Sequence, residues 1–326
     1  LARASWTNSI CSPPPCLGIL DKLNLSTPTL ARAPGTNSIY PSHPCQGSWD
    51  KLSLSTSPFP VGANRLNSFD MPVVACSRTA VCPTKVKMQE MSSESGQPAI
   101  GTVLVTGASR GIGLDFVRAW LERGVQVIAG CRNPTGASAL GTLMSEHGER
   151  LRVMQLDVTD ERSVETMAGA LGNLNIDLLI NNAGILQVES LENMDFASII
   201  EQFKVNALGA LQVTRALLSN LRDGAKIINI TSRMGSLDDN TSGGYYGYRM
   251  SKAALNMATR SLAVDLKSRG IIVIAMHPGM VQTDLTRGFG MLTPAESVAG
   301  MNQVIDKLTI EQSGLFLHYQ GTTLPW

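Results

Sequence analysis

The chain has 326 residues, enough for one large folded domain or two small ones with a substantial hydrophobic core. Its formal net charge of +1 at pH 7 gives no electrostatic reason to expect nucleic acid or an anionic membrane surface as a partner. The longest uninterrupted apolar run, residues 271–276, is far shorter than the roughly 20 residues that a membrane-spanning helix needs. We therefore expect a soluble protein.

Residues 1–97 are predicted to be a disordered or low-order extension, because twelve of the sixteen prolines precede residue 101 and five of the six cysteines lie within this segment. The segment Thr7-Asn-Ser-Ile recurs as Thr36-Asn-Ser-Ile, so residues 1–58 hold an internal repeat with a period of 29 residues. A solenoid needs at least three stacked copies, so this repeat does not predict one.

Two interpretations of the extension stay open. It is non-native, with Met71, Met88 or Met91 as the true start, or it is a plastid or mitochondrial targeting segment, since it is rich in serine and poor in acidic residues. We favour the first, because no amphipathic Arg-rich helix is evident. The expected location is then the cytoplasm, and the plastid if the extension is a transit segment.

Cysteine usage agrees with a reducing compartment. Cys131 is the one cysteine after residue 97, so it has no partner there for an internal disulfide. The earlier cysteines lack paired CxxC or HExxH spacing, so we expect no metal site.

From residue 98 onward, strand-like and helical patterns alternate. The β-branched and apolar runs predict strands at 102–106, 125–129, 152–156, 177–180, 226–230, 271–276 and 314–319. The apolar residues at helical spacing predict helices at 111–122, 136–147, 161–171, 195–221, 246–269 and 294–308. This alternation is typical of right-handed crossovers in a parallel sheet. The fold class is therefore α/β, with a single doubly wound parallel-sheet (Rossmann) domain over residues 98–326.

A glycine-rich turn follows the first predicted strand. Gly107 allows the tight turn, and Gly111 and Gly113 let the backbone approach a pyrophosphate at the start of the next helix. The spacing is GxxxGxG rather than GxGxxG. Its position directly after a strand favours dinucleotide binding over a purely structural turn.

The end of the second predicted strand indicates which dinucleotide binds. An NAD site places a carboxylate there for the ribose 2′-hydroxyl, but this chain has Gly130-Cys131-Arg132. The planar guanidinium of Arg132 suits a 2′-phosphate, and Arg110 in the glycine turn adds a second charge. We therefore expect NADP(H) in preference to NAD(H), unless both arginines are solvated surface residues.

Tyr248 lies four residues before Lys252, so the two side chains share one face of the predicted helix 246–269. A free tyrosine has a pKa of about 10, and a nearby ammonium lowers it by favouring the phenolate. Tyr245 and Tyr246 have Arg249 and Met250 at the corresponding positions, so Tyr248 is the predicted proton donor.

These motifs, in this order, resemble the short-chain dehydrogenase/reductase family over residues 101–326. The matching residues are Thr106-Gly107…Gly111-Ile112-Gly113, Asp157-Val158, Asn181-Asn182-Ala183-Gly184, Asn206, Ser232, Tyr248…Lys252 and Pro278-Gly279. The segments that begin at Asn229 and Asp239 and the ending Gly321-Thr-Thr-Leu-Pro-Trp look like the C-factor/sniffer-type carbonyl reductases.

The resemblance implies a catalytic set of Asn206, Ser232, Tyr248 and Lys252. Ser232 would orient the substrate oxygen, with Ser236 as a rival because Ser232 is 16 residues from Tyr248, a longer spacing than the family usually shows. Asn206 would support a water relay to Lys252. The implied cofactor-binding residues are Gly107, Ser109, Arg110, Gly111, Ile112, Gly113, Arg132, Asp157, Val158, Asn182, Ala183, Gly184, Tyr248, Lys252, Pro278, Gly279, Val281 and Thr283.

The expected function is the NADP(H)-dependent interconversion of a carbonyl and an alcohol. The segment 284–292, which sets selectivity in the family, is short and favours an open site for small or aromatic carbonyls. A reductase of carrier-bound or lipid substrates and an NADP(H)-binding sensor with little turnover are the alternatives. The resemblance also implies a possible homodimer through the helices that carry Asn206 and Tyr248.

Overall fold

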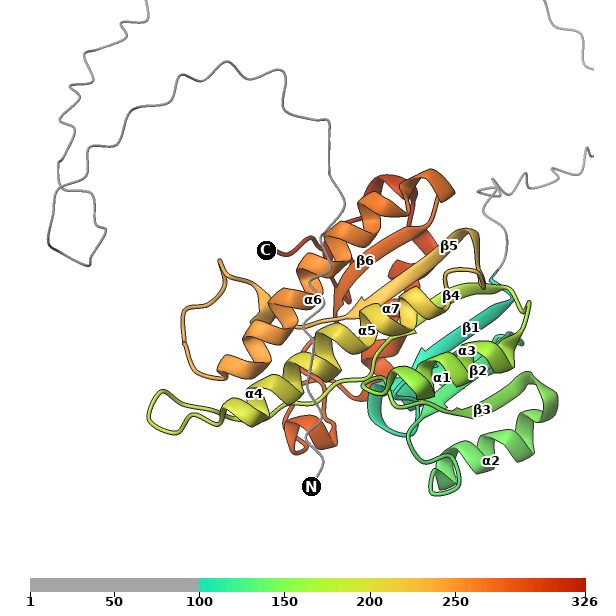
Figure 1. Ribbon diagram of the computed structural model, residues 1–326, viewed down its shortest axis with the longest axis horizontal. Coiled ribbons are helices and arrows are strands. Elements are labelled where there is room, and N and C mark those ends of the chain that lie inside the picture. The colour runs from blue at the N-terminus through green and yellow to red at the C-terminus, as the bar shows by residue number, and fades with distance from the viewer. Residues whose placement is uncertain (1–99) are drawn as a thin grey trace, which may run out of the picture. The chain divides into compact units, whose positions relative to one another are not determined.

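Seven parallel strands form one sheet in the computed structural model, which describes residues 100–326 (Figure 1). The strand order is β3-β2-β1-β4-β5-β6-β7. The strands are β1 (Thr102–Thr106), β2 (Gln126–Cys131), β3 (Leu151–Gln155), β4 (Ile176–Asn181), β5 (Leu221–Ile230), β6 (Ile272–His277) and β7 (Phe316–His318). The doubly wound α/β prediction is confirmed. The predictions for residues 1–97 lie outside the described residues.

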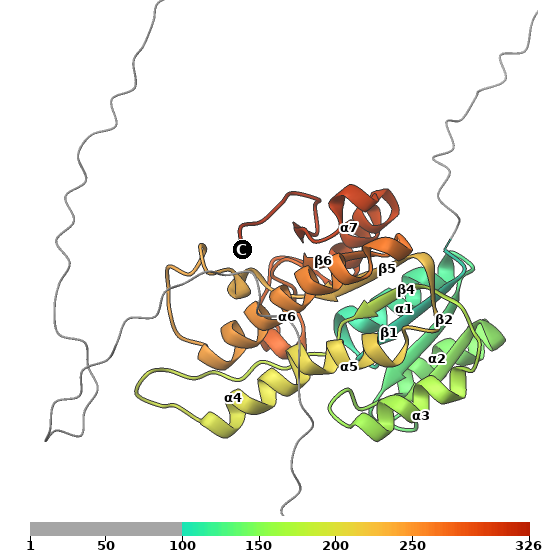
Figure 2. The ribbon, with the colours of Figure 1, turned by 45° about the horizontal axis from the view of Figure 1, so that its top comes forward.

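Helices cover both faces of this sheet (Figures 1 and 2). On one face lie α1 (Gly111–Glu122), α2 (Ser138–His147) and α7 (Pro294–Lys307). On the other lie α3 (Glu161–Leu171), α5 (Gly209–Ala216) and α6 (Tyr246–Asp265), with α4 (Phe196–Phe203) packed beside α6. No helix within residues 100–326 is long and apolar enough to cross a membrane.

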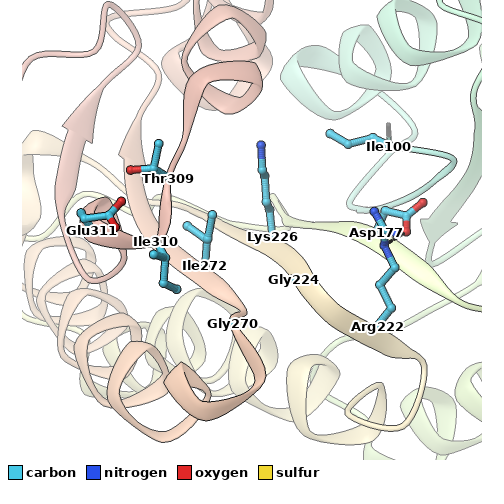
Figure 3. A pocket seen from close by; sticks show the side chains of 10 residues that line it. All are labelled: Ile100, Asp177, Arg222, Gly224, Lys226, Gly270, Ile272, Thr309, Ile310 and Glu311. Carbon is cyan, nitrogen blue, oxygen red and sulfur yellow. Dashed lines mark ion pairs between the residues drawn. The ribbon is translucent and has the colours of Figure 1, made fainter. Parts of the chain in front are cut away.

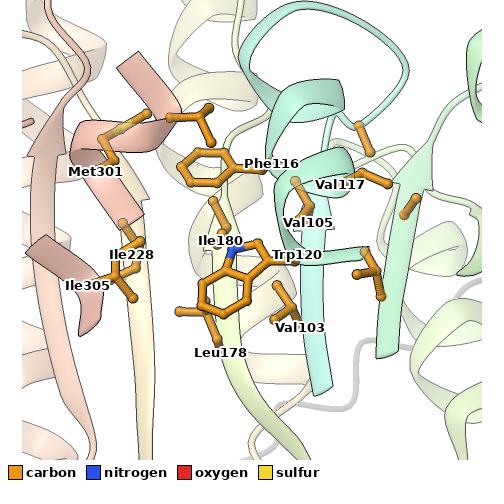
Figure 4. Packing of buried hydrophobic residues seen from close by; sticks show 14 of the residues in the cluster. Val103, Val105, Phe116, Val117, Trp120, Leu178, Ile180, Ile228, Met301 and Ile305 are labelled. Carbon is orange, nitrogen blue, oxygen red and sulfur yellow. The ribbon is translucent and has the colours of Figure 1, made fainter. Parts of the chain in front are cut away.

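Successive side chains of each strand point to opposite faces of the sheet, and a separate apolar core lies on each face. In β1, Val103 and Val105 face α1 and α7, whereas Leu104 faces the opposite core. Figure 4 shows Trp120 and Phe116 of α1 packed over the strands; both are fully buried. These two cores fix the strands, and therefore the loops that leave their carboxyl ends.

One predicted helix differs from the structure. The helix expected over 195–221 is interrupted by a π-helical segment, Lys204–Leu208, and α5 ends at Ala216. Gly209 is the first residue of α5, and a Cβ there would lie 2.7 Å from the Val158 side chain, so no larger residue fits this close approach. The strand after it, β5, begins at Leu221 rather than at residue 226, because Leu221 pairs with Ile176 before an irregularity in the register.

Candidate active site

The glycine turn lies where β1 passes into α1, as the sequence predicts. Gly107 has φ +64°, and a Cβ there would lie 2.8 Å from Ala183 Cα. The Asn182 side chain donates to the carbonyl oxygens of Thr106, at 2.9 Å, and Gly107, at 3.1 Å. The segment after β4 therefore clamps the turn in place, and Asn182, Ala183 and Gly184 lie beside it.

The amino end of α1 is suited to an anionic group. The α1 helix has no capping side chain and no acidic residue in its first turn. Because the first N–H groups of a helix lack internal partners and carry partial positive charge, this end of α1 fits the pyrophosphate of a dinucleotide.

Two further predicted segments meet this region. A Cβ on Gly111 would lie 3.4 Å from the Thr283 side chain, so the segment after Pro278-Gly279 borders the glycine turn. Arg110 Nη1 lies 3.2 Å from Asp284 Oδ2 in an exposed ion pair that the sequence did not predict. Such surface pairs contribute under about 1 kcal/mol, so this one leaves Arg110 able to exchange its partner.

Arg132 and Asp157 lie near each other at the ends of β2 and β3. Arg132 is exposed. Burial raises the pKa of Asp157, but hydrogen bonds from Thr159 and the charge of Arg132 outweigh this and bring that pKa below its ordinary value. Asp157 accepts from the backbone N–H and the hydroxyl of Thr159, so its carboxylate is held by its own loop. Val158 is buried and packs against Gly209.

The four predicted catalytic residues come from three parts of the fold and are all buried. Ser232 follows β5, Asn206 lies in the π-helical segment, and Tyr248 and Lys252 lie on α6. Lys252 Nζ lies 5.7 Å from the centre of the Tyr248 ring and donates to the Ile230 carbonyl oxygen at 2.9 Å. A Cβ on Gly184 would lie 3.2 Å from Asn206 Oδ1 and 3.6 Å from Lys252 Nζ, so these groups converge on Gly184.

The two candidate serines have different surroundings. Ser232 is hydrogen-bonded to Tyr248, which lowers the pKa of the phenol in part. Ser236 donates to the main-chain oxygen of Trp326 at 3.1 Å and accepts from the Asp239 N–H at 3.2 Å. The hydroxyl of Ser236 is thus used to hold its loop against the C-terminal segment, whereas the hydroxyl of Ser232 lies at the phenol.

Burial controls the ionisation of the tyrosine and the lysine. It raises the pKa of Tyr248 to about 12, with the Ser232 hydrogen bond acting in the opposite direction. It lowers the pKa of Lys252 to about 8. The sequence predicted that Lys252 lowers the pKa of Tyr248. In the structure desolvation is the larger influence, and Lys252 Nζ bonds to a carbonyl oxygen rather than to the phenol.

Asn206 has a structural role that the sequence did not predict in full. Its Oδ1 accepts from the Ile185 N–H at 2.8 Å, and its Nδ2 donates to the Ile185 carbonyl oxygen and to Ser251 Oγ, both at 2.9 Å. Ser251 Oγ in turn donates to the Tyr248 carbonyl oxygen at 2.8 Å. The π-helical turn thus joins the segment after β4 to α6. Ser251, which takes part in this connection, has no recognisable signal in the sequence. The water-relay role of Asn206 stays a prediction.

A cavity of about 340 Å³ lies at the opposite edge of the sheet, near the amino ends of β1, β4 and β6. Figure 3 shows Lys226 between Ile100 and Thr309, with Arg222 beside Asp177. The cavity contains none of the predicted site residues. Parallel sheets bind ligands beyond their carboxyl ends, where the glycine turn and Tyr248 lie.

A doubly wound parallel sheet, a glycine turn and an uncapped helix end together define a dinucleotide-binding α/β protein. Residues 101–290 match the model of the short chain dehydrogenase family. The chain belongs to this family. It is an oxidoreductase of the carbonyl reductase-like kind, and the predicted family resemblance is confirmed.

Three relatives indicate its place in the family. The C-signal protein of Myxococcus xanthus is 51% identical over 154 residues, which are 46% of this chain and 93% of that protein. The NADPH-bound carbonyl reductase from chicken fatty liver is 37% identical with a TM-score of 0.67, covering 70% of this chain and 99% of that one. The carbonyl reductase Sniffer of D. melanogaster is 31% identical with a TM-score of 0.67, covering 70% of this chain and 100% of that one.

Proposed function

We propose that this protein is an NADP(H)-dependent oxidoreductase that interconverts a carbonyl and an alcohol through Tyr248, Lys252, Ser232 and Asn206. The observation that carries the proposal is the buried Tyr248 phenol, which is hydrogen-bonded to Ser232 and has Lys252 one helical turn away. All three lie at the carboxyl edge of the sheet, close to the glycine turn.

In the reducing direction, a bound nicotinamide would supply hydride to the carbonyl carbon. Ser232 would donate a hydrogen bond to the carbonyl oxygen and orient it toward Tyr248. Tyr248 would then transfer its phenolic proton to that oxygen, acting as the general acid. Lys252, when protonated, would stabilise the phenolate that remains and would bind the ribose hydroxyls of the cofactor.

Cofactor preference is proposed from charge. Arg132 is exposed at the end of β2, and the strand ends without a carboxylate for a ribose 2′-hydroxyl. Arg110 lies on the glycine turn with its side chain largely exposed. Both guanidinium groups favour a 2′-phosphate, which supports NADP(H) over NAD(H).

The substrate is proposed to be a small or aromatic carbonyl compound of apolar character. The segment after Pro278-Gly279 is short, and its large apolar side chains are unusually exposed: Met280 is 60% exposed, Phe289 76% and Met291 84%. Side chains of this kind would lose water contact on binding an apolar compound, which favours that compound by the hydrophobic effect.

A homodimer is proposed through the face formed by α4, α5 and α6. Exposed apolar side chains follow this face at helical spacing, and they are Phe196, Ile200, Leu211, Met250, Met257 and Val264. Large apolar side chains exposed along neighbouring helices favour an interface. Multi-angle light scattering tests it: the wild type should have twice the mass of the chain, and Met257→Glu should be monomeric. A monomeric wild type contradicts the proposal.

The test of function is NADPH oxidation with a panel of small aliphatic, aromatic, steroid and carrier-bound carbonyls. Turnover of small or aromatic carbonyls supports the proposal. A strong preference for a steroid or a carrier-bound substrate contradicts the assignment of the substrate. Tight NADPH binding with no turnover of any carbonyl supports the alternative, a sensor of NADP(H).

A further inference from the structure

Glu189 is a buried carboxylate in the segment between β4 and α4. Only 3% of the residue is exposed, and within residues 100–326 no arginine, lysine or histidine forms an ion pair with it. A buried carboxylate without such a partner is costly unless hydrogen bonds compensate. The hydrogen bonds that compensate this carboxylate therefore indicate which elements it holds together.

Three donors from two helices converge on this carboxylate. Oε1 accepts from the Ser198 hydroxyl at 3.1 Å and from the Gln202 side-chain amide, both on α4. Oε2 accepts from the Gly247 backbone N–H at 3.2 Å, in the first turn of α6. The Glu189 carbonyl oxygen also accepts from the Tyr245 N–H at 3.0 Å. Residue 189 thus bonds to the start of α6 through both its side chain and its main chain.

The start of α6 needs such a partner. Tyr245, at its N-cap, has φ +52° and gives no side-chain cap, so the first N–H groups of the helix lack a local acceptor. A negative charge at a helix N-terminus is also favoured by the helix dipole. Glu189 therefore supplies to α6, from a distant segment, the cap that Asp195 supplies locally to α4.

The packing at this point is close. A Cβ on Gly247 would lie 2.5 Å from Gln202 Nε2 and 3.1 Å from Glu189 Oε1. Gly247 directly precedes Tyr248, which lies in the same first turn of α6. The position of the Tyr248 phenol therefore depends on whether this turn is held in place.

We propose that Glu189 is a positioning residue that fixes the first turn of α6, and thereby the proton-donating Tyr248, to the segment after β4. The inference rests on the proposed function, because it gives a role to Tyr248 in turnover. Glu189 does not touch the predicted cofactor residues of the glycine turn. Lys252, the predicted ribose ligand on α6, is held separately by the Ile230 carbonyl oxygen. Removal of the Glu189 carboxylate is therefore expected to affect proton transfer and to leave NADPH binding nearly unchanged.

Glu189→Gln tests the role with little change of shape. An amide has one accepting oxygen and one donating nitrogen, so either Gly247 or the Gln202–Ser198 pair would lose its acceptor. We expect kcat to fall about tenfold, with the NADPH dissociation constant within about twofold of wild type. Glu192→Gln is the matched control, since Glu192 is an exposed residue of the same segment and its change should leave kcat unaltered.

The reciprocal change is the sharper test. Gln202 Oε1 accepts from the Gln187 N–H at 2.9 Å, and a carboxylate at position 202 can keep that bond. In the double variant Glu189→Gln/Gln202→Glu, the new amide can accept from Gly247 and donate to the new carboxylate, so the bond between positions 189 and 202 is restored with its polarity reversed. The Gln187 N–H keeps its acceptor, and the Ser198 hydroxyl can donate to the carboxylate at position 202. Gln202→Glu alone places two buried carboxylates together. We therefore expect each single change to lower kcat and the double change to bring it within about twofold of wild type.

Exchange of the Gly247 amide proton, followed by nuclear magnetic resonance, gives a readout that does not depend on turnover. It should be slow in the wild type and in the double variant, and at least about tenfold faster in Glu189→Gln. If the wild type reduces no carbonyl while this exchange pattern holds, the proposed function fails and the capping role stands. The inference is overturned if Glu189→Gln changes neither the exchange rate of the Gly247 amide proton nor kcat. It is also overturned if the double variant has a kcat no higher than that of the single variants. The double variant still decides if Glu189→Gln does not fold.

Discussion

Gly113→Ala tests whether the glycine turn is shaped for a cofactor. A Cβ at position 113 would lie 2.3 Å from the Gly107 carbonyl oxygen and 2.5 Å from Asn182 Nδ2, whereas ordinary contacts begin at 3.4 Å. The turn must therefore move by about 1.1 Å, the difference between 3.4 and 2.3. Such overpacking costs about 1–3 kcal/mol, against a gain of up to about 1 kcal/mol from better helix propensity.

We expect Gly113→Ala to lose about 1–2 kcal/mol of unfolding free energy and to bind NADPH at least about tenfold more weakly, since the displaced turn forfeits one or more hydrogen bonds to the pyrophosphate. Urea unfolding and fluorescence titration with NADPH measure the two effects. The control is Gly141→Ala in α2, where a Cβ meets nothing within 4 Å, and it should stabilise by up to about 1 kcal/mol and leave binding unchanged. Wild-type NADPH affinity in Gly113→Ala refutes the reasoning.

Three further predictions concern single side chains of the site. Ser232→Ala should lower kcat about 100-fold and Ser236→Ala less than about threefold, because the Tyr248 phenol is hydrogen-bonded to Ser232, whereas the Ser236 hydroxyl is bonded to Trp326. A larger loss of kcat in Ser236→Ala than in Ser232→Ala would assign the orientation of the substrate oxygen to Ser236. Burial lowers the pKa of Lys252 to about 8, so its ammonium is present below that pH and is lost above it. The kcat/KM for carbonyl reduction should therefore fall as pH rises through about 8, and a profile flat to pH 10 contradicts this. Arg132→Asp should shift the NADPH-to-NADH preference toward NADH by at least about tenfold, and an unchanged ratio of kcat/KM values rules out a 2′-phosphate contact.

Local patterns were sufficient to predict the sheet and most of its helices. The strand β1 and the helices α1 and α3 have the predicted bounds, because apolar periodicity and short turns determine them. The prediction of one continuous helix over 195–221 was wrong, because a π-helical segment separates α4 from α5. This π-helical turn accompanies the contacts of Asn206 with Ile185 and Ser251, and such contacts between distant segments leave no periodic signal.

Residue spacing was sufficient to place Tyr248 and Lys252 one turn apart on a single helix, α6, and their catalytic roles stay predictions. The choice between Ser232 and Ser236 depended on a loop whose shape is set by Trp326, about 90 residues away in the chain, so spacing alone left it open. The Arg110–Asp284 pair and the carboxylate of Glu189 were missed for the same reason. Their partners lie on elements that meet only after the sheet has formed.

The most direct test of the central claim compares Tyr248→Phe with Tyr246→Phe in NADPH-dependent carbonyl reduction. Both changes remove one hydroxyl from the first turns of α6, but only Tyr248 lies against Ser232 and Lys252. We predict that Tyr248→Phe lowers kcat about 1,000-fold with NADPH affinity retained, and that Tyr246→Phe has the wild-type kcat. Turnover that survives in Tyr248→Phe, or that is lost equally in Tyr246→Phe, contradicts the account.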